Sequence, residues 1–119
     1  MNKKILLVTA LLISPIAALA ADKAMKMGDH ASMSAASQEL MAGMTSMHDD
    51  MMAGVMSSDP DVAFAKGMIA HHQGAIQMSE TQLKFGKDPE MRKLAEEIIK
   101  AQQPEIDQMQ KWVKSHEKK

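Results

Sequence analysis

Two adjacent histidines stand between methionines in the segment MIAHHQGAIQM, residues 68–78. Imidazole and thioether together, without thiolate, suit a soft metal ion such as Cu(I) or Ag(I). Met68 and His72 are four residues apart and would share one face of a helix, whereas His71 and Met78 are seven apart and would lie along one edge. Adjacent side chains on a helix point about 100° apart, so the two imidazoles would face different neighbours. They would form either two sites, or one ligand and one residue that orients it.

Methionine is the most informative count in the composition. The chain has 14 Met among 119 residues, with two Phe, one Trp, no Tyr and no Cys. Methionine is a flexible, polarisable side chain that can fill gaps in a core, and it is also a soft metal ligand. The composition therefore leaves two interpretations open, a core packed by methionine or a supply of thioether ligands. The absence of cysteine excludes disulfides and a cysteine nucleophile.

Residues 1–20 have the pattern of a cleaved secretory signal. A short basic start precedes an apolar run that ends in Ala-Leu-Ala at residues 18–20. A retained membrane anchor is the alternative, but the run is short for a span of about 20 residues and contains Pro15. We expect cleavage after Ala20 and a periplasmic protein, in a compartment where thiols oxidise and thioethers are the safer choice.

The charge balance excludes some partners. The signal removes two of the 14 basic residues, which leaves 12 against 15 acidic ones and changes the formal charge from −1 to −3. That charge is too small to indicate nucleic acid or an anionic membrane surface as a partner.

The hydrophobic pattern predicts an all-α protein. Residues 21–36 have no apolar period; they would be a flexible tail that either collects metal or is an unstructured leader. The helical domain, residues 37–119, should begin with Ser37 as N-cap. The second and third helices, 60–85 and 89–115, both begin with Asp-Pro, a cap followed by proline at the first helical position. We expect an antiparallel bundle of three helices, completed to four by the tail or by dimerisation. The tail contains Met25, Met27, His30 and Met33.

The expected register brings the polar residues of the apolar stripes to one level. Short connections make neighbouring helices antiparallel. Folding the first helix back on the second places Met44 opposite His72 and His48 opposite Met68. Folding the second on the third places the two histidines opposite residues 101–103 and Met68 opposite Glu105. The resulting layer contains Met44, His48, Met68, His71, His72, Gln102 and Glu105, with Met51 and Met52 just beyond it.

Such a layer needs a purpose, because a buried polar group without a partner costs roughly 1–3 kcal/mol. One purpose is a hydrogen-bond network in which Glu105 and Gln102 pair with the imidazoles. The other is a metal site, with these two residues orienting the ligands. The residues alone leave both open. The His-Glu-x-x-His pattern of zinc proteases and the Glu-x-x-His pattern of di-iron bundles are both absent.

Three segments resemble a known family. HDDMM (48–52), DPDVAFAKGMIAHHQGAIQMSE (59–80) and DPEMRKLAEEIIKAQQPEIDQMQKWV (88–113) are similar to the bacterial domain-of-unknown-function family numbered 305. Its members include exported copper-binding, copper-resistance proteins of the CopM type. The resemblance implies a ferritin-like helical bundle that binds Cu(I) or Ag(I) through Met and His. Carried over by position, the implied ligands are His48, Met51, Met52, Met68, His71, His72, Met78 and Met109.

These observations predict a periplasmic protein that sequesters or hands on Cu(I), contributes to copper tolerance and is not an enzyme. Ag(I) would act as a surrogate, and Cu(II) stays open. The expected partners are the metal ion and other copper-handling proteins, with no nucleic acid and no membrane after signal cleavage; a homodimer is left open. The alternative is a Met-rich helical interaction module with no metal role, which predicts an exposed apolar groove and self-association without metal.

Overall fold

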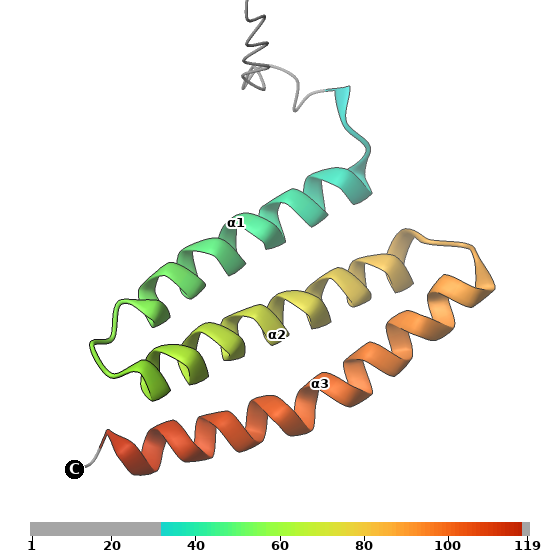
Figure 1. Cartoon of the computed structure of the whole chain (residues 1–119). Coiled ribbons are helices and arrows are strands. Elements are labelled where there is room, and N and C mark those ends of the chain that lie inside the picture. Colours follow the sequence, from blue (N-terminus) through green and yellow to red (C-terminus); the bar gives the residue numbers. More distant parts are fainter. Residues whose placement is uncertain (1–31, 118–119) are drawn as a thin grey trace, which may run out of the picture.

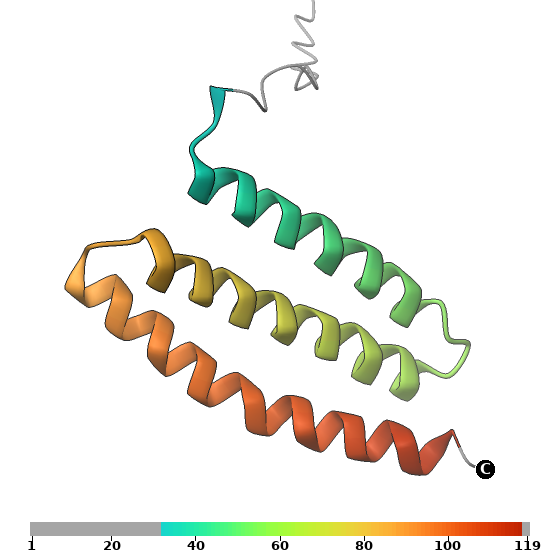
Figure 2. The same cartoon turned by 180° about the vertical axis from the view of Figure 1, so that it is seen from behind.

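The computed structural model describes residues 32–117, which form three long helices: α1 (Ala35–Val55), α2 (Pro60–Phe85) and α3 (Pro89–His116). No strand occurs in this range, so the expected all-α bundle of antiparallel helices is confirmed. Both Figure 1 and Figure 2 show α2 between α1 and α3, and the extensive contacts are those of α2 with each neighbour. The expected signal and the tail residues Met25, Met27 and His30 lie outside the described residues. Within residues 32–117, no helix combines the length and apolarity that a membrane crossing requires.

The two Asp-Pro starts are confirmed. The Asp59 carboxylate accepts hydrogen bonds from the backbone amides of Asp61 (2.8 Å) and Val62 (3.3 Å), and α2 begins at the following proline. Asp88 accepts one from the Met91 amide at 2.9 Å at the start of α3. A short acceptor side chain at the cap satisfies amides that the first turn leaves without partners.

The first helix begins earlier than expected. Its N-cap is Ser34, whose Oγ accepts a hydrogen bond from the Ser37 amide at 3.1 Å, so the prediction of Ser37 as the cap is wrong by three residues. Residues 35 and 36 are alanines, which favour the helix, and Ser34 offers the same cap chemistry in front of them. The carbonyl of Met33 accepts a hydrogen bond from the Gln38 side chain just outside this end.

Glycines let α1 and α2 approach closely. Gly54 lies so near α2 that a methyl group on it would come within 2.9 Å of the Lys66 carbonyl carbon. A methyl group on Gly74 would overlap the thioether of Met47. Larger side chains at these positions would force the helix axes apart, so the contact between the two helices depends on small residues.

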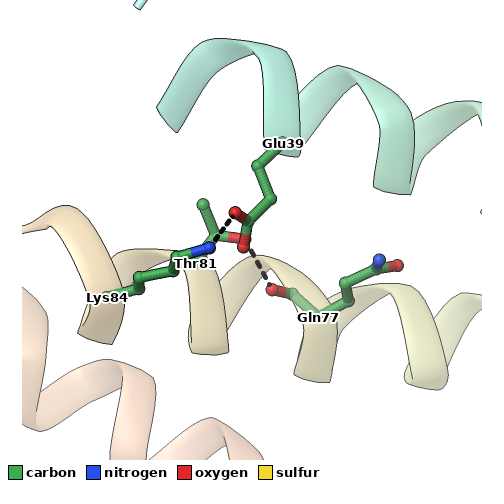
Figure 3. A network of polar contacts seen from close by, with 4 residues as sticks. All are labelled: Glu39, Gln77, Thr81 and Lys84. Carbon is green, nitrogen blue, oxygen red and sulfur yellow. Dashed lines mark hydrogen bonds and ion pairs between the residues drawn. The ribbon is translucent and has the colours of Figure 1, made fainter. Parts of the chain in front are cut away.

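A polar cluster joins the same two helices at their other end (Figure 3). Glu39 of α1 accepts hydrogen bonds from Lys84 at 2.6 Å and from Thr81 at 3.1 Å, and Thr81 also bonds the Gln77 carbonyl. The hydrogen bond from Lys84 is the largest cause of a lowered Glu39 pKa, with desolvation opposing it and the Thr81 bond and lysine charge adding to it. Glu39 is therefore ionised at neutral pH and bridges α1 to α2.

Three helices in one layer enclose little core. In the described residues, the buried apolar side chains are three alanines, one isoleucine and one valine (Ala65, Ala70, Ala95, Ile106 and Val113). No methionine between residues 32 and 117 is buried. The interpretation of a core packed by methionine is therefore wrong for this part of the chain, where every methionine is exposed or half-buried.

Candidate metal-binding face

The two edges of α2 that pack against its neighbours determine where its other side chains point. Gly67 and Gly74 meet α1, whereas His72 meets α3 through Glu105. Winding α2 at 100° per residue leaves His71 and Met78 between these edges, on one side of the three-helix layer. We call this side the open face. Its members are Met41, Met44, His48, Met51, Met52 and Val55 of α1, Phe64, Met68, His71 and Met78 of α2, and Met91, Leu94, Ile98, Glu105 and Met109 of α3.

Contacts at both seams support this assignment. Val55 lies against Gly67, which places the Met/His stripe of α1 on the same side as His71. A shallow groove shared by α2 and α3 is lined by Met78, Met91 and Ile98 among others, which places that edge of α3 there too. All the predicted ligands from His48 to Met109 therefore border one face of the layer, except that His72 lies beneath it.

The sequence predicts an apolar stripe on α1 that should face the other helices, and this stripe does not serve as the packing face. Its members are Leu40, Met41, Met44, His48, Met51, Met52 and Val55. Met44 and Met52 are 51% and 50% exposed, and Val55 is 46% exposed. The helix turns Gly43 and Gly54, both buried, toward α2 instead. The expectation that this stripe faces the bundle is wrong, because glycine allows the closer backbone approach and displaces the methionines to the edge of the contact.

The register between α1 and α2 also differs from the expected one. Met47 lies against Gly74, whereas the expected register placed it opposite Ile69. The predicted juxtapositions of Met44 with His72 and of His48 with Met68 are therefore wrong by about five residues. The observed register brings two other pairs of predicted ligands level with each other across this seam: Met44 with Met78, and Met51 with His71.

The register between α2 and α3 is shifted by about one turn. His72 Nε2 lies 2.5 Å from Glu105 Oε2, whereas Met68 was the expected neighbour of Glu105. With this pairing fixed, Met68 falls level with Met109 on the facing helix. α3 runs without interruption through Pro104 and curves along its length (Figure 1). Glu105 does pair with an imidazole, which was one of the two uses left open for it, and its partner is His72.

His72 has the most specific geometry on this face. Its side chain is 9% exposed, and Nδ1 is buried without a hydrogen-bond partner in the described structure. When Nε2–H donates to the Glu105 carboxylate, a neutral imidazole carries its lone pair on Nδ1. Carboxylates hold metal-ligating histidines in this way, fixing the tautomer and the ring orientation. The pair thus presents one oriented, unused nitrogen donor.

His71 has a different environment. It is exposed, and its ring centroid lies 6.1 Å from that of His72 with an interplanar angle of 65°. The two imidazoles point in different directions, as predicted: His72 pairs with Glu105 of α3, and His71 lies exposed on the open face. The structure thus separates one exposed and one buried imidazole on a single turn of α2.

The remaining predicted ligands are accessible to different degrees. Met44, His48, Met52 and Met78 are exposed, and Met51, Met68, Met109 and Gln102 are half-buried. Among residues 32–117, no three His, Asp or Glu side chains come together as a metal-binding group. The sequence interpretation missed Met47, which lies in the α1–α2 seam against Gly74; the glycine opposite it was the available signal. Ligand roles for all these residues stay predictions.

Comparison with known proteins gives a family without an assigned activity. The chain matches the family described as "Domain of unknown function (DUF305)" over residues 14–116. A protein of Acanthamoeba polyphaga mimivirus, named "Uncharacterized protein L153", is 45% identical over 49 residues, which cover 41% of this chain and 32% of the viral protein. The aligned part is therefore about a third of that relative's length. Because the family match extends over most of the chain, this protein belongs to the DUF305 family.

Proposed function

We propose that this protein is an exported, non-catalytic copper-binding protein that holds Cu(I) at the open face through methionine sulfur and histidine nitrogen. The observation that carries the proposal is His72, whose buried Nδ1 has no hydrogen-bond partner in the described structure while Glu105 holds the opposite nitrogen. Burying an imidazole nitrogen without a partner is unfavourable, so a bound metal ion would compensate for that cost. His72 Nδ1 is the donor that the fold has oriented.

The donors near His72 suit a soft ion. The register places the thioethers of Met68 and Met109 level with each other across the α2–α3 seam, next to the His72 position. Thioether and imidazole prefer Cu(I), and Ag(I) resembles it in this preference. At the other seam, His71 lies level with Met51 and forms a second candidate donor pair. Bound copper would supply no reaction in this proposal; the protein's residues would hold the ion and limit its access to water.

The resemblance to CopM-type proteins and the pattern of residues 1–20 support a physiological role in the periplasm. The protein would sequester Cu(I) or hand it to other copper-handling proteins and so contribute to copper tolerance. Binding of Cu(II) would require harder ligands than the thioethers of the open face.

Anaerobic titration with Cu(I) against a chelator of known affinity tests the proposal. We expect binding that His72→Ala weakens strongly and that His71→Ala weakens separately. His116→Ala is the matched control, since His116 stacks on Trp112 at the end of α3 and is not a predicted ligand. Absence of binding, or equal loss in all three variants, would refute a role for the histidine pair.

Conservative methionine variants test the thioethers. Leucine keeps the volume and apolarity of methionine but removes the sulfur. Met51→Leu and Met68→Leu should each weaken copper binding, whereas Met56→Leu should not, because Met56 is 77% exposed and lies beyond the end of α1. Equal affinities in all three proteins would show that sulfur is not a ligand.

The exposure of the open face also favours a second candidate function, an interaction module without a metal role. Apolar, Met-rich faces adapt to varied partners. Metal content after growth with added copper separates the two: a protein recovered without copper, and unable to take it up, would be the interaction module.

A further inference from the structure

The open face leaves a large apolar surface uncovered. Eight of its side chains, from Met41 on α1 to Leu94 on α3, are between 37% and 65% exposed, with Phe64 the most exposed at 65%. If a free side chain of this size exposes about 150–200 Å², these fractions amount to roughly 700 Å². The largest apolar patch of a typical monomer is about 300–600 Å², and a standard interface buries about 800 Å² on each partner. The face is thus large enough for a stable protein contact.

The charge distribution indicates which partner fits. Among the residues given for the open face there is no lysine or arginine, and Glu105, the one carboxylate among them, is bonded to His72. Asp61, at the start of α2, lies two turns before Met68 on the same edge. Both lysines of α2 lie on the other side of the layer, where Lys66 pairs with Glu117 and Lys84 pairs with Glu39. Apart from carboxylates and histidines the face is apolar, and an apolar patch is complementary to its own copy, as an interface with two-fold symmetry requires.

We infer that the open face is a homodimer interface, in which two copies pack their Met/His faces together and convert two three-helix layers into one closed six-helix core. The buried apolar side chains that a single layer lacks are then supplied by the methionines, Phe64 and Leu94 of both copies. His71, exposed in one chain, lies inside the contact. The inference concerns the same face as the proposed copper site but does not depend on copper.

Sedimentation velocity on the purified, metal-free protein tests the inference. We expect twice the mass of one chain at micromolar concentration in the presence of a chelator. Introducing charge with Phe64→Lys and Leu94→Lys together should yield monomers that keep their helical circular dichroism, since neither residue is buried and neither is a predicted ligand. The matched control is Gln73→Lys with Gln103→Lys, two exposed residues on the other side of the layer, and this variant should remain dimeric.

Several results would overturn the inference. They are a monomeric wild-type protein, a control variant that dissociates as readily as the face variant, and a monomer whose face is protected by the tail or binds lipid vesicles. The copper titration separates failure of the dimer inference from failure of the proposed function. A monomer that binds Cu(I) refutes only the dimer, and a dimer that binds no Cu(I) refutes only the copper role. If the variants lose helical content, hydrogen exchange of the wild-type protein takes their place as the test. Amides around Phe64 in α2 should then be protected at high but not at low protein concentration.

Discussion

The contact of Gly54 with α2 allows a quantitative prediction for Gly54→Ala. A methyl group there would lie 2.9 Å from both the carbonyl carbon and the Cβ of Lys66 and 3.0 Å from the Gly67 amide nitrogen. Two of these atoms belong to the backbone of α2, so no rotamer change can relieve the clash. The helices would have to separate by several tenths of an ångström, which loosens the whole α1–α2 seam.

The expected magnitude is the difference of two effects. Overpacking a close contact costs about 1–3 kcal/mol, and replacing glycine by alanine inside a helix gains up to about 1 kcal/mol. Taking the middle of the overpacking range, about 2 kcal/mol, Gly54→Ala should therefore lower the free energy of unfolding by about 1–2 kcal/mol. Gly43→Ala is the matched control, because the atoms nearest to its methyl group would be the end of the exposed Gln77 side chain, at 3.0 Å. That side chain can rotate away, so the control should be stabilised by up to about 1 kcal/mol.

Urea denaturation followed by circular dichroism measures the free energy of unfolding of both variants. Both should be measured at one protein concentration, because self-association makes the apparent stability depend on concentration. The two substitutions in the same helix should change the free energy of unfolding in opposite directions. A Gly54→Ala protein as stable as wild type, or two variants shifted in the same direction, would refute the claim that backbone contact at Gly54 limits the approach of α1 and α2.

Three further predictions concern polar contacts. Glu105→Gln should weaken Cu(I) affinity about 10–100-fold by releasing the orientation of His72, as for other residues behind a metal ligand; unchanged affinity in chelator competition would contradict this. Folding lowers the pKa of Glu39, so the ionised side chain stabilises the fold at pH values above its ordinary pKa of 4.5. This stabilisation is lost as the pH falls through the pKa of the folded protein. The difference in unfolding free energy between wild type and Glu39→Gln should therefore shrink from pH 7 to pH 3 in urea titrations. Arg92 Nη1 donates to the Leu83 and Gly86 carbonyls at 2.7 and 2.9 Å, so Arg92→Met should lower the free energy of unfolding by about 1.5–3 kcal/mol, whereas the largely exposed Lys93→Met should change it by less than about 0.5.

The helix boundaries could be predicted where local chemistry fixes them. Asp59 and Asp88, each followed by proline, start α2 and α3 as expected, because the cap and the fixed proline φ act within a single turn. Local chemistry does not fix the start of α1 in this way, because Ser34 and Ser37 are equally good N-caps. The two alanines between them favour the helix, and this preference selects Ser34.

The candidate site could be predicted in its members more than in its arrangement. The divergence of His71 from His72 follows from helical spacing. The pairing of Glu105 with an imidazole was one of two alternatives for a buried polar layer, and the expected register had placed Glu105 opposite Met68. Which residues meet across the seams could not be predicted, because a shift of one turn between helices hardly alters the amphipathic pattern of either helix.

The amino-acid sequence by itself determined three helices, their antiparallel order and the placement of methionine and histidine along one side of each. These properties depend on interactions within a few residues, namely caps, turns and periodicity. Only the tertiary structure decided that α1 packs by glycine, that no methionine of residues 32–117 is buried, and that His72 buries Nδ1 while its Nε2 bonds a carboxylate. Those properties depend on how closely two backbones can approach, which small residues on both helices set together and neither helix encodes alone.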